Sequence, residues 1–201
     1  MHIPDGFLSP AVTGLTDAAG LAIWGASVRK LPFDVEQIPR WGMAGALLFA
    51  VEIFSFPVPG GTSVHLSGIP MVTLIFGPVP ALFLSGIVLF LQAVLFGHGG
   101  ILTWGANFLN MGILGVGLTW WGVRLGRRVF PEAVAVGFAT GIAILLGAMA
   151  AAVELGLSGT LPLPHTLLVM ILATLPLSVV EGLLTTFGVQ MLRRLPSFQS
   201  S

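Results

Sequence analysis

The sequence lacks cysteine and carries few charged residues. With no cysteine among its 201 residues, it forms no disulfide, no thiolate metal site and no thiol nucleophile. Charged residues make up 8% of the chain and the formal net charge is zero, so there is no basic surface for nucleic acid. The motifs Gly-x-x-x-x-Gly-Lys-Ser/Thr, His-Glu-x-x-His and Gly-x-Ser-x-Gly are also absent. We therefore expect a protein that is not an enzyme and does not hydrolyse ATP itself.

Apolar residues dominate the rest of the composition. They make up 55% of the chain and the mean hydropathy is strongly positive, which is more apolar surface than a soluble domain of this size buries. The first residues include His2, Pro4 and Asp5 where a cleavable signal carries positive charge, so we expect the N-terminus to be retained. The sequence predicts a single integral membrane domain over residues 1–201.

Apolar runs separated by proline, glycine and charge predict an all-α fold with about seven transmembrane helices. The predicted segments cover residues 10–28, 41–56, 69–76, 79–95, 102–122, 133–155 and 167–192. The third is shorter than the roughly 20 residues that a helix needs to cross the bilayer core. It either starts earlier, in the glycine-rich stretch before it, or is a broken or re-entrant helix enclosed by protein or a water-filled cavity.

The basic residues orient this topology. All eight follow the first, fifth or seventh segment: Arg29, Lys30, Arg40, Arg124, Arg127, Arg128, Arg193 and Arg194. With seven spans these positions share one side of the membrane, which the positive-inside rule identifies as the cytoplasm. The N-terminus is therefore expected outside and the C-terminus in the cytoplasm.

The same topology places all four histidines on the outer side: His2, His65, His98 and His165. A histidine at position 2 can turn the N-terminus into a chelator. The Met1 amine, the His2 backbone nitrogen and a His2 imidazole nitrogen close two fused rings around one ion, leaving one planar position for another imidazole. This geometry suits Ni(II) and Cu(II), and Co(II) can adopt it. Residues 1–9 are thus expected to form a metal-chelating segment outside the membrane.

Four motifs, in order along the chain, resemble the CbiM/NikM family, the substrate-binding membrane components of energy-coupling-factor importers for cobalt and nickel. They are MHIPDGFLSP at 1–10, FPVPGGTSVHLSG at 56–68, FGHGGILTWGANFLNMG at 96–112 and EGLLT at 181–185. The resemblance implies Co(II) or Ni(II) as transported substrate, with no catalytic cofactor. It also implies a membrane coupling subunit, paired cytoplasmic ABC-type ATPases, often a small accessory membrane subunit, and the prokaryotic cytoplasmic (inner) membrane as location.

The resemblance further implies the ligand set. The ion is held by the Met1 amine, the His2 backbone and imidazole nitrogens, and the imidazole of His65. Residues 57–68 are expected to form an outer loop whose prolines and paired glycines let His65 swing over the chelate. From the residues alone, His65 can equally cap the next helix or lie solvated in a loop.

Three positions depart from the family pattern. Val64 replaces a glycine and stiffens the expected loop, His98 replaces an aspartate, and Thr174 stands where many members carry a histidine. His98 has two interpretations: it is a functional residue, either a partner of the metal ligands or an entry ligand that concentrates cations above the site, or it is a solvated loop histidine. His165, which follows two prolines, is expected at a helix start or at the membrane interface.

Polar residues near the chelate are candidates to hold the N-terminus in place. Asp5, Asn107 and Asn110 are expected to bond backbone amides of the folded-in segment. The remaining acids within or near the apolar segments are expected to make interhelical hydrogen bonds: Asp17, Glu52, Glu154 and Glu181.

The first apolar segment carries small residues every four positions: Gly14, Ala18, Ala22 and Ala26. They predict close approach of another helix, from a partner membrane protein or from this chain. The alternative function, an ATP-independent secondary metal-ion permease, needs ligands along a path through the bilayer, whereas the histidines are confined to one side. We therefore expect the ion-capturing subunit of an importer whose activity depends on ATPase partners.

Overall fold

The computed structural model describes residues 2–32, 34–58 and 62–194. Within these residues the chain is mostly helical, and α5, η1 and α6 form one continuous run. The helices are α1 (Pro10–Lys30), α2 (Ile38–Ile53), α3 (Ile69–Phe76), α4 (Pro78–Phe96), α5 (Trp104–Asn107), η1 (Phe108–Ile113), α6 (Leu114–Gly126), α7 (Glu132–Leu157) and α8 (Leu163–Leu192). The start of α1 follows the rules for helix caps, since Ser9 Oγ accepts the Val12 N–H at 3.4 Å and Pro10 lies in the first turn.

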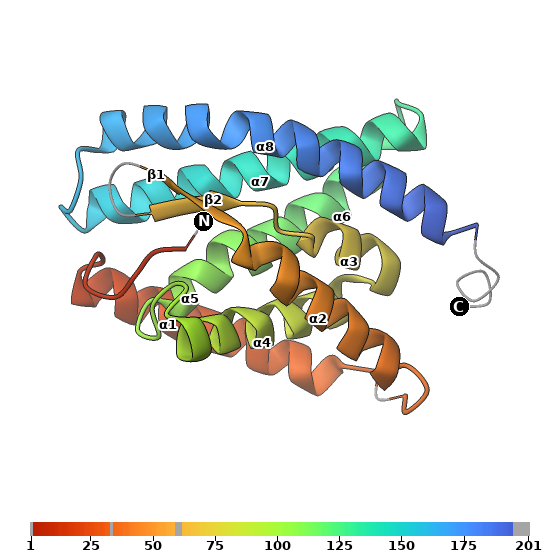
Figure 1. Ribbon diagram of the computed structural model, residues 1–201, viewed down its shortest axis with the longest axis horizontal. Coiled ribbons are helices and arrows are strands. Elements are labelled where there is room, and N and C mark those ends of the chain that lie inside the picture. Colours follow the sequence, from red (N-terminus) through yellow and green to blue (C-terminus); the bar gives the residue numbers. More distant parts are fainter. Residues whose placement is uncertain (1, 33, 59–61, 195–201) are drawn as a thin grey trace.

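The helices lie side by side, and the chain ends and the connections between helices gather at two opposite ends of the bundle (Figure 1). The N-terminal segment, the turn between α7 and α8 and the connection into α5 lie at one end of the bundle, on the left of the view. The connection between α1 and α2, the turn between α6 and α7 and the C-terminal end of α8 lie at the other. The basic residues belong to this second end and the N-terminal histidine to the first.

Four helices in the described part of the chain are long and apolar enough to cross a membrane, namely α1, α4, α7 and α8. The outward face of α8 is apolar along its whole length: Leu168, Leu172, Leu175, Val179, Leu183 and Phe187 are all exposed. A continuous apolar face of this kind is typical of a surface covered by lipid or by another membrane protein. The prediction of a helical membrane protein is confirmed, and the short third segment has its predicted bounds, Ile69–Phe76.

The expected outer loop differs from the structure. Two strands, β1 (Ser55–Val58) and β2 (Thr62–His65), form an antiparallel hairpin in which Ser55 pairs with His65 and Phe56 with Val64. Residues 59–61, part of the expected loop, lie outside the described residues. The predicted second helix, over residues 41–56, was therefore wrong at its C-terminal end, because aromatic and β-branched residues favour a pleated strand and Val64 is buried in the strand pair.

A π-helical turn, η1, interrupts the run from α5 to α6. It packs against α4 and α7, and Phe108, Asn110 and Met111 are buried there. Asn107 lies directly before this turn and is also buried. Such turns are frequent at functional sites, and this one carries the predicted polar residue Asn110, with Asn107 directly before it.

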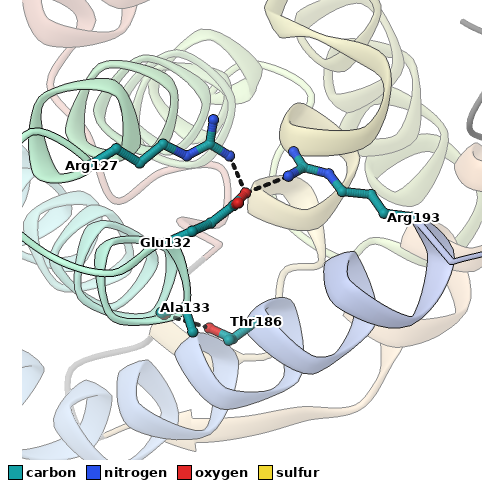
Figure 2. Close-up of polar contacts among 5 residues, drawn as sticks. All are labelled: Arg127, Glu132, Ala133, Thr186 and Arg193. Atoms are coloured by element: carbon teal, nitrogen blue, oxygen red, sulfur yellow. Dashed lines mark hydrogen bonds and ion pairs between the residues drawn. The ribbon is translucent and has the colours of Figure 1, made fainter.

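Small residues allow α6, α7 and α8 to pack closely. A Cβ atom on Gly182 would lie 2.7 Å from the Gly137 carbonyl oxygen, and one on Gly122 would lie 2.9 Å from Ala139 Cβ. At the end of these helices opposite the N-terminus, Glu132 accepts hydrogen bonds from both Arg127 and Arg193 (Figure 2). One carboxylate therefore ties together the ends of three helices.

The small-residue positions of α1 face away from the protein. Gly14, Ala18, Ala22 and Ala26 are all exposed. A Cβ atom on Gly14 would point into open space among the described residues, with no neighbouring heavy atom within 4 Å. Packing within the described chain uses another face of α1, where Gly20 approaches Gly105 of α5 to 3.1 Å from its built Cβ. The small residues of α1 therefore do not pack against another helix in the described part of this chain, which was one of the two predictions made for them.

Candidate metal site

The N-terminal segment enters the protein and is held there through Ile3, which is fully buried. The Ile3 N–H donates to Asn107 Oδ1 at 2.7 Å, and the Ile3 carbonyl oxygen accepts from Asn107 Nδ2 at 3.0 Å. The same carbonyl oxygen also accepts from Gly100 N at 3.0 Å and from Thr103 Oγ1 at 2.6 Å. Four hydrogen bonds thus fix Ile3 beside His2. Two of them are made with Asn107, which was predicted to bond the backbone of this segment.

Asp5 holds the other end of this segment. Its carboxylate accepts the backbone N–H groups of Ile101, Leu102 and Thr103 at 2.9–3.2 Å, just before α5. The expected partners were amides of the N-terminal segment itself, whereas the observed partners belong to the connection between α4 and α5. Gly100 is required beside it, since a Cβ there would lie 1.9 Å from Asp5 Oδ1.

His2 lies in the interior with 3% of its surface exposed. Its carbonyl oxygen accepts from Thr62 Oγ1 at 3.2 Å, which connects the N-terminal segment to β2. Its Nε2 atom is buried and has no hydrogen-bond partner among the described residues. Met1, the other predicted ligand of this segment, lies outside the described residues.

His65 ends β2 and is 4% exposed. Its Nδ1 lies 2.9 Å from the Leu66 carbonyl oxygen. Because a carbonyl oxygen only accepts, Nδ1 carries the proton and Nε2 carries the lone pair that a metal needs. The neutral tautomer suited to ligation through Nε2 is therefore set by the backbone.

Glu181 of α8 anchors the chain just after His65. Its two carboxylate oxygens accept the backbone N–H groups of Ser67 at 2.8 Å and Gly68 at 2.6 Å. Gly68 has a φ of 70°, a conformation that favours glycine, and it leads into α3. A buried carboxylate from a distant helix thus fixes the connection that follows the predicted ligand.

The two imidazoles lie at a separation that suits a shared ion. The ring centroids of His2 and His65 are 4.6 Å apart with an interplanar angle of 12°. An ion about 2.0–2.1 Å from an imidazole nitrogen lies about 3.2 Å from the ring centroid, so two rings bound at right angles have centroids about 4.5 Å apart. The observed spacing therefore equals that of two adjacent positions of a planar nitrogen set, although the rings are stacked and must turn for both lone pairs to meet at one ion.

Burial keeps these imidazoles neutral. Removal from water lowers the pKa of His2 well below the ordinary imidazole value, and the neighbouring rings of His65 and His98 act in the same direction. Burial likewise lowers the pKa of His65 well below that value, while its bond to the Leu66 carbonyl opposes the shift. Both rings are thus unprotonated at neutral pH, the form that binds metal.

His98 joins this cluster. Its ring centroid lies 4.0 Å from that of His2 and 5.9 Å from that of His65, and its Nε2 lies 3.1 Å from Ser55 Oγ. The interpretation as a solvated loop residue is therefore wrong, because tertiary packing brings His98 against the other rings. His165 lies elsewhere, exposed at the start of α8.

Of the remaining predicted polar residues, Asn110 and Asp17 make interhelical hydrogen bonds, whereas the bond predicted for Glu52 is not found among the described residues. Asn110 Nδ2 donates to Glu154 Oε2 at 2.7 Å, which replaces its expected contact with the N-terminal segment. Asp17 Oδ1 accepts the Gly105 N–H at 2.7 Å and so links α1 to α5. Glu52 is fully buried, and neither carboxylate oxygen has a hydrogen-bond partner among the described residues.

Sequence reasoning missed three residues that hold the site. Glu181 carried a usable signal, a carboxylate within an apolar segment, and was assigned only to interhelical bonding. Thr62 and Thr103 carried none, since their partners lie 60 and 100 residues away in the sequence. In the described part of the chain, no set of three or more His, Asp or Glu side chains is already arranged to hold a metal. A complete site made by side chains alone is therefore not present there.

The fold and the cluster define a helical membrane protein whose folded-in N-terminal segment brings a histidine against a second histidine at one end of the bundle. The family model described as "Cobalt uptake substrate-specific transmembrane region" matches residues 2–197, and the chain belongs to this family. The resemblance to the CbiM/NikM family is thereby confirmed.

Relatives and a solved structure agree with this assignment. The "Probable fused nickel transport protein LarMN" of Lactiplantibacillus plantarum is 37% identical over 161 residues, 78% of this chain and 49% of that protein. The "Cobalt transport protein CbiM" of Clostridium cellulovorans is 30% identical over 197 residues, 92% of this chain and 76% of that protein. A structure described as "Crystal Structure of an Truncated Transition metal Transporter" has a TM-score of 0.90 and 30% identity, covering 96% of this chain and 99% of that one. The chain spans about half the length of the fused nickel transport relative.

Proposed function

We propose that this protein is the ion-binding subunit of an ATP-driven energy-coupling-factor importer and captures Co(II) or Ni(II) outside a prokaryotic cytoplasmic membrane. The observation that supports this most is the buried pair of neutral imidazoles, with centroids 4.6 Å apart. His2 is held through its neighbour Ile3, and His65 is held by the hairpin and the Leu66 carbonyl. Ligands fixed before the ion arrives bind it with little reorganisation.

The proposed ligands are the Met1 amine, the His2 backbone nitrogen, His2 Nδ1 and His65 Nε2. Nδ1 is the His2 ring nitrogen nearer the backbone, so it closes the smaller chelate ring with the His2 nitrogen. In that chelate the open planar position lies at right angles to Nδ1, which agrees with the spacing of the two rings. Asn107 and Asp5 position the segment that carries these ligands.

This nitrogen set accounts for selectivity against the abundant divalent ions. Mg(II) and Ca(II) prefer oxygen ligands, whereas Ni(II) and Co(II) gain from nitrogen ligands. Binding releases protons from the terminal amine, and also from the His2 amide when its nitrogen ligates. The side chains that hold the segment are polar but bind backbone groups, which keeps them from competing for the ion.

We further propose seven transmembrane passages, with the N-terminus and hairpin outside and the C-terminus in the cytoplasm. The basic residues support this orientation, because they lie at the end of the bundle opposite the N-terminal segment (Figure 1). Arg124 also stacks over Trp120 at 4.5 Å from the ring centroid, a pairing of cationic and aromatic side chains suited to a membrane interface.

Energy is proposed to come from partner subunits. The exposed small residues of α1 offer a close-packing face to a membrane coupling subunit, which in turn binds paired cytoplasmic ABC-type ATPases. A small accessory membrane subunit completes the proposed assembly. The alternative, an ATP-independent permease, is disfavoured because the clustered imidazoles lie at one end of the bundle and form no path through it.

The test is binding of Ni(II) and Co(II) to purified protein by isothermal titration calorimetry. The His2→Ala and His65→Ala variants should each lose tight binding, whereas His165→Ala, an exposed histidine away from the cluster, should retain it. Loss of binding in His165→Ala alone would refute the proposed site. Uptake into vesicles in the absence of ATPase partners would instead support the permease.

A further inference from the structure

His98 has an unexplained buried nitrogen beside the proposed ligand His2. Its Nδ1 is inaccessible to solvent and has no hydrogen-bond partner among the described residues. The Nε2 atom of His2 is in the same condition, and the two ring centroids are 4.0 Å apart with a 49° tilt. A buried polar atom without a partner costs free energy, so two such atoms on touching rings call for an explanation.

The two nitrogens become complementary when His2 binds an ion through Nδ1. An imidazole that ligates through Nδ1 is neutral only with its proton on Nε2, so His2 Nε2 becomes an N–H donor. His98 Nδ1 accepts when the proton of that ring is on Nε2, where Ser55 Oγ at 3.1 Å provides the acceptor. A hydroxyl oxygen accepts as well as donates, so this tautomer satisfies both nitrogens of His98.

The backbone around His98 is suited to holding this ring in place. The His98 N–H donates to the Gln92 carbonyl oxygen at 3.1 Å, and Gly97 and Gly99 adopt φ values of 62° and 82°. A Cβ on Gly99 would lie 3.2 Å from His2 Nδ1 and 3.0 Å from Asn107 Nδ2. The connection therefore passes directly against His2, and only glycine fits there without strain.

We propose that His98 is a positioning residue, resting on the proposed function, whose Nδ1 accepts a hydrogen bond from the Nε2–H of metal-bound His2. The two rings are now in contact without a hydrogen bond, and they must move apart by about 1 Å when the ion binds, because a hydrogen bond between two imidazole nitrogens places the ring centroids about 5 Å apart. The bond orients the His2 ring and makes its ligating nitrogen more basic, as outer partners of metal-bound imidazoles do. Ser55 fixes the required tautomer from the other side.

Four variants test this role by Ni(II) titration calorimetry and by the visible absorption of the bound ion. His98→Ala should weaken binding by about 10- to 100-fold and shift the absorption band. His98→Asn, whose amide oxygen takes the place of Nδ1, should recover most of the affinity and the wild-type band. His98→Gln, which places its amide nearer Ser55, should not, and Ser55→Ala should lose less than His98→Ala.

Three results would overturn the proposal. The first is equal Ni(II) affinity in wild type and His98→Ala, and the second is an equal loss of affinity in His98→Asn and His98→Ala. The third is a change of the absorption spectrum in His98→Ala from that of a five- or six-coordinate ion to that of a planar one, which would make His98 itself a ligand. Failure of the proposed function is distinguishable, because wild type and His2→Ala would then bind Ni(II) equally weakly.

Discussion

Replacing Asn107 with alanine should release the N-terminal segment and weaken metal binding. The substitution leaves the Ile3 N–H buried without its acceptor, at a cost of about 1–3 kcal/mol, and removes one of three donors from the Ile3 carbonyl, at about 0.5–1.5 kcal/mol. The Gly100 and Thr103 donors to that carbonyl remain. The substitution therefore weakens docking of the segment by about 1.5–4.5 kcal/mol in total.

Because the ion binds only when the segment is docked, this cost raises the dissociation constant for Ni(II) by up to about 10- to 1,600-fold. Any part of it that is not seen in affinity appears as a lower melting temperature of the metal-free protein. Titration calorimetry and thermal unfolding, measured on the same preparation, account for both parts. Asn107→Asp, which keeps the acceptor for the Ile3 N–H, should lose less.

Asn110→Ala is the matched control. Asn110 lies three residues further along the same buried helical run and donates to Glu154, so its loss also removes one buried hydrogen bond. We expect a comparable fall in melting temperature with the Ni(II) affinity within about threefold of wild type. Equal affinity losses in Asn110→Ala and Asn107→Ala would refute the reasoning, as would an Asn107→Ala protein unchanged in both measurements.

Three further outcomes are expected. Glu181→Gln should weaken Ni(II) binding in calorimetry, because an amide supplies one acceptor where two N–H groups now bind two oxygens; unchanged binding would show that the connection after His65 does not need this anchor. Gly100→Ala should lower the melting temperature, since its Cβ would meet Asp5 at 1.9 Å, and an unchanged melting curve would contradict that contact. Acidification should remove the stability that the neutral rings of His2 and His65 give the metal-free protein: folding lowers the pKa of both, so below about pH 6.5 the unfolded state binds more protons at these two positions. His65→Gln should therefore lose less unfolding free energy than wild type between pH 7 and 5, and equal losses in the two proteins would contradict a neutral buried ring at His65.

The helices could be predicted from hydropathy because the bilayer imposes long apolar segments. The bounds of α3 were predicted to the residue, and those of α4 and α7 to within two. The end of α2 was not, because the apolar run continues past Ile53 into β1 and periodicity over a few residues does not separate helix from strand. The Gly60-Gly61 pair and the β-branched residues after it are typical of a β-hairpin, but we interpreted this stretch as a loop.

The site was predictable only in its chemistry. A histidine at position 2 and the surrounding motifs predict His2 and His65 as ligands, and the polar side chain of Asn107 within an apolar segment predicts that it holds the N-terminal segment. The actual partners could not be predicted, since Asp5 bonds amides about 100 residues away and Asn110 turns to Glu154 instead. His98 was left open for the same reason: its packing against His2 depends on how distant connections meet in three dimensions.

The central claim is that the N-terminus itself supplies metal ligands, and one comparison tests it directly. Purified protein with a free Met1 amine is titrated with Ni(II) beside a form that carries one extra residue before Met1, with visible absorption recorded for both. Tight binding and a planar Ni(II) spectrum in the first form, lost in the second, is the predicted result. Equal affinity and identical spectra in the two forms would contradict the terminal chelate.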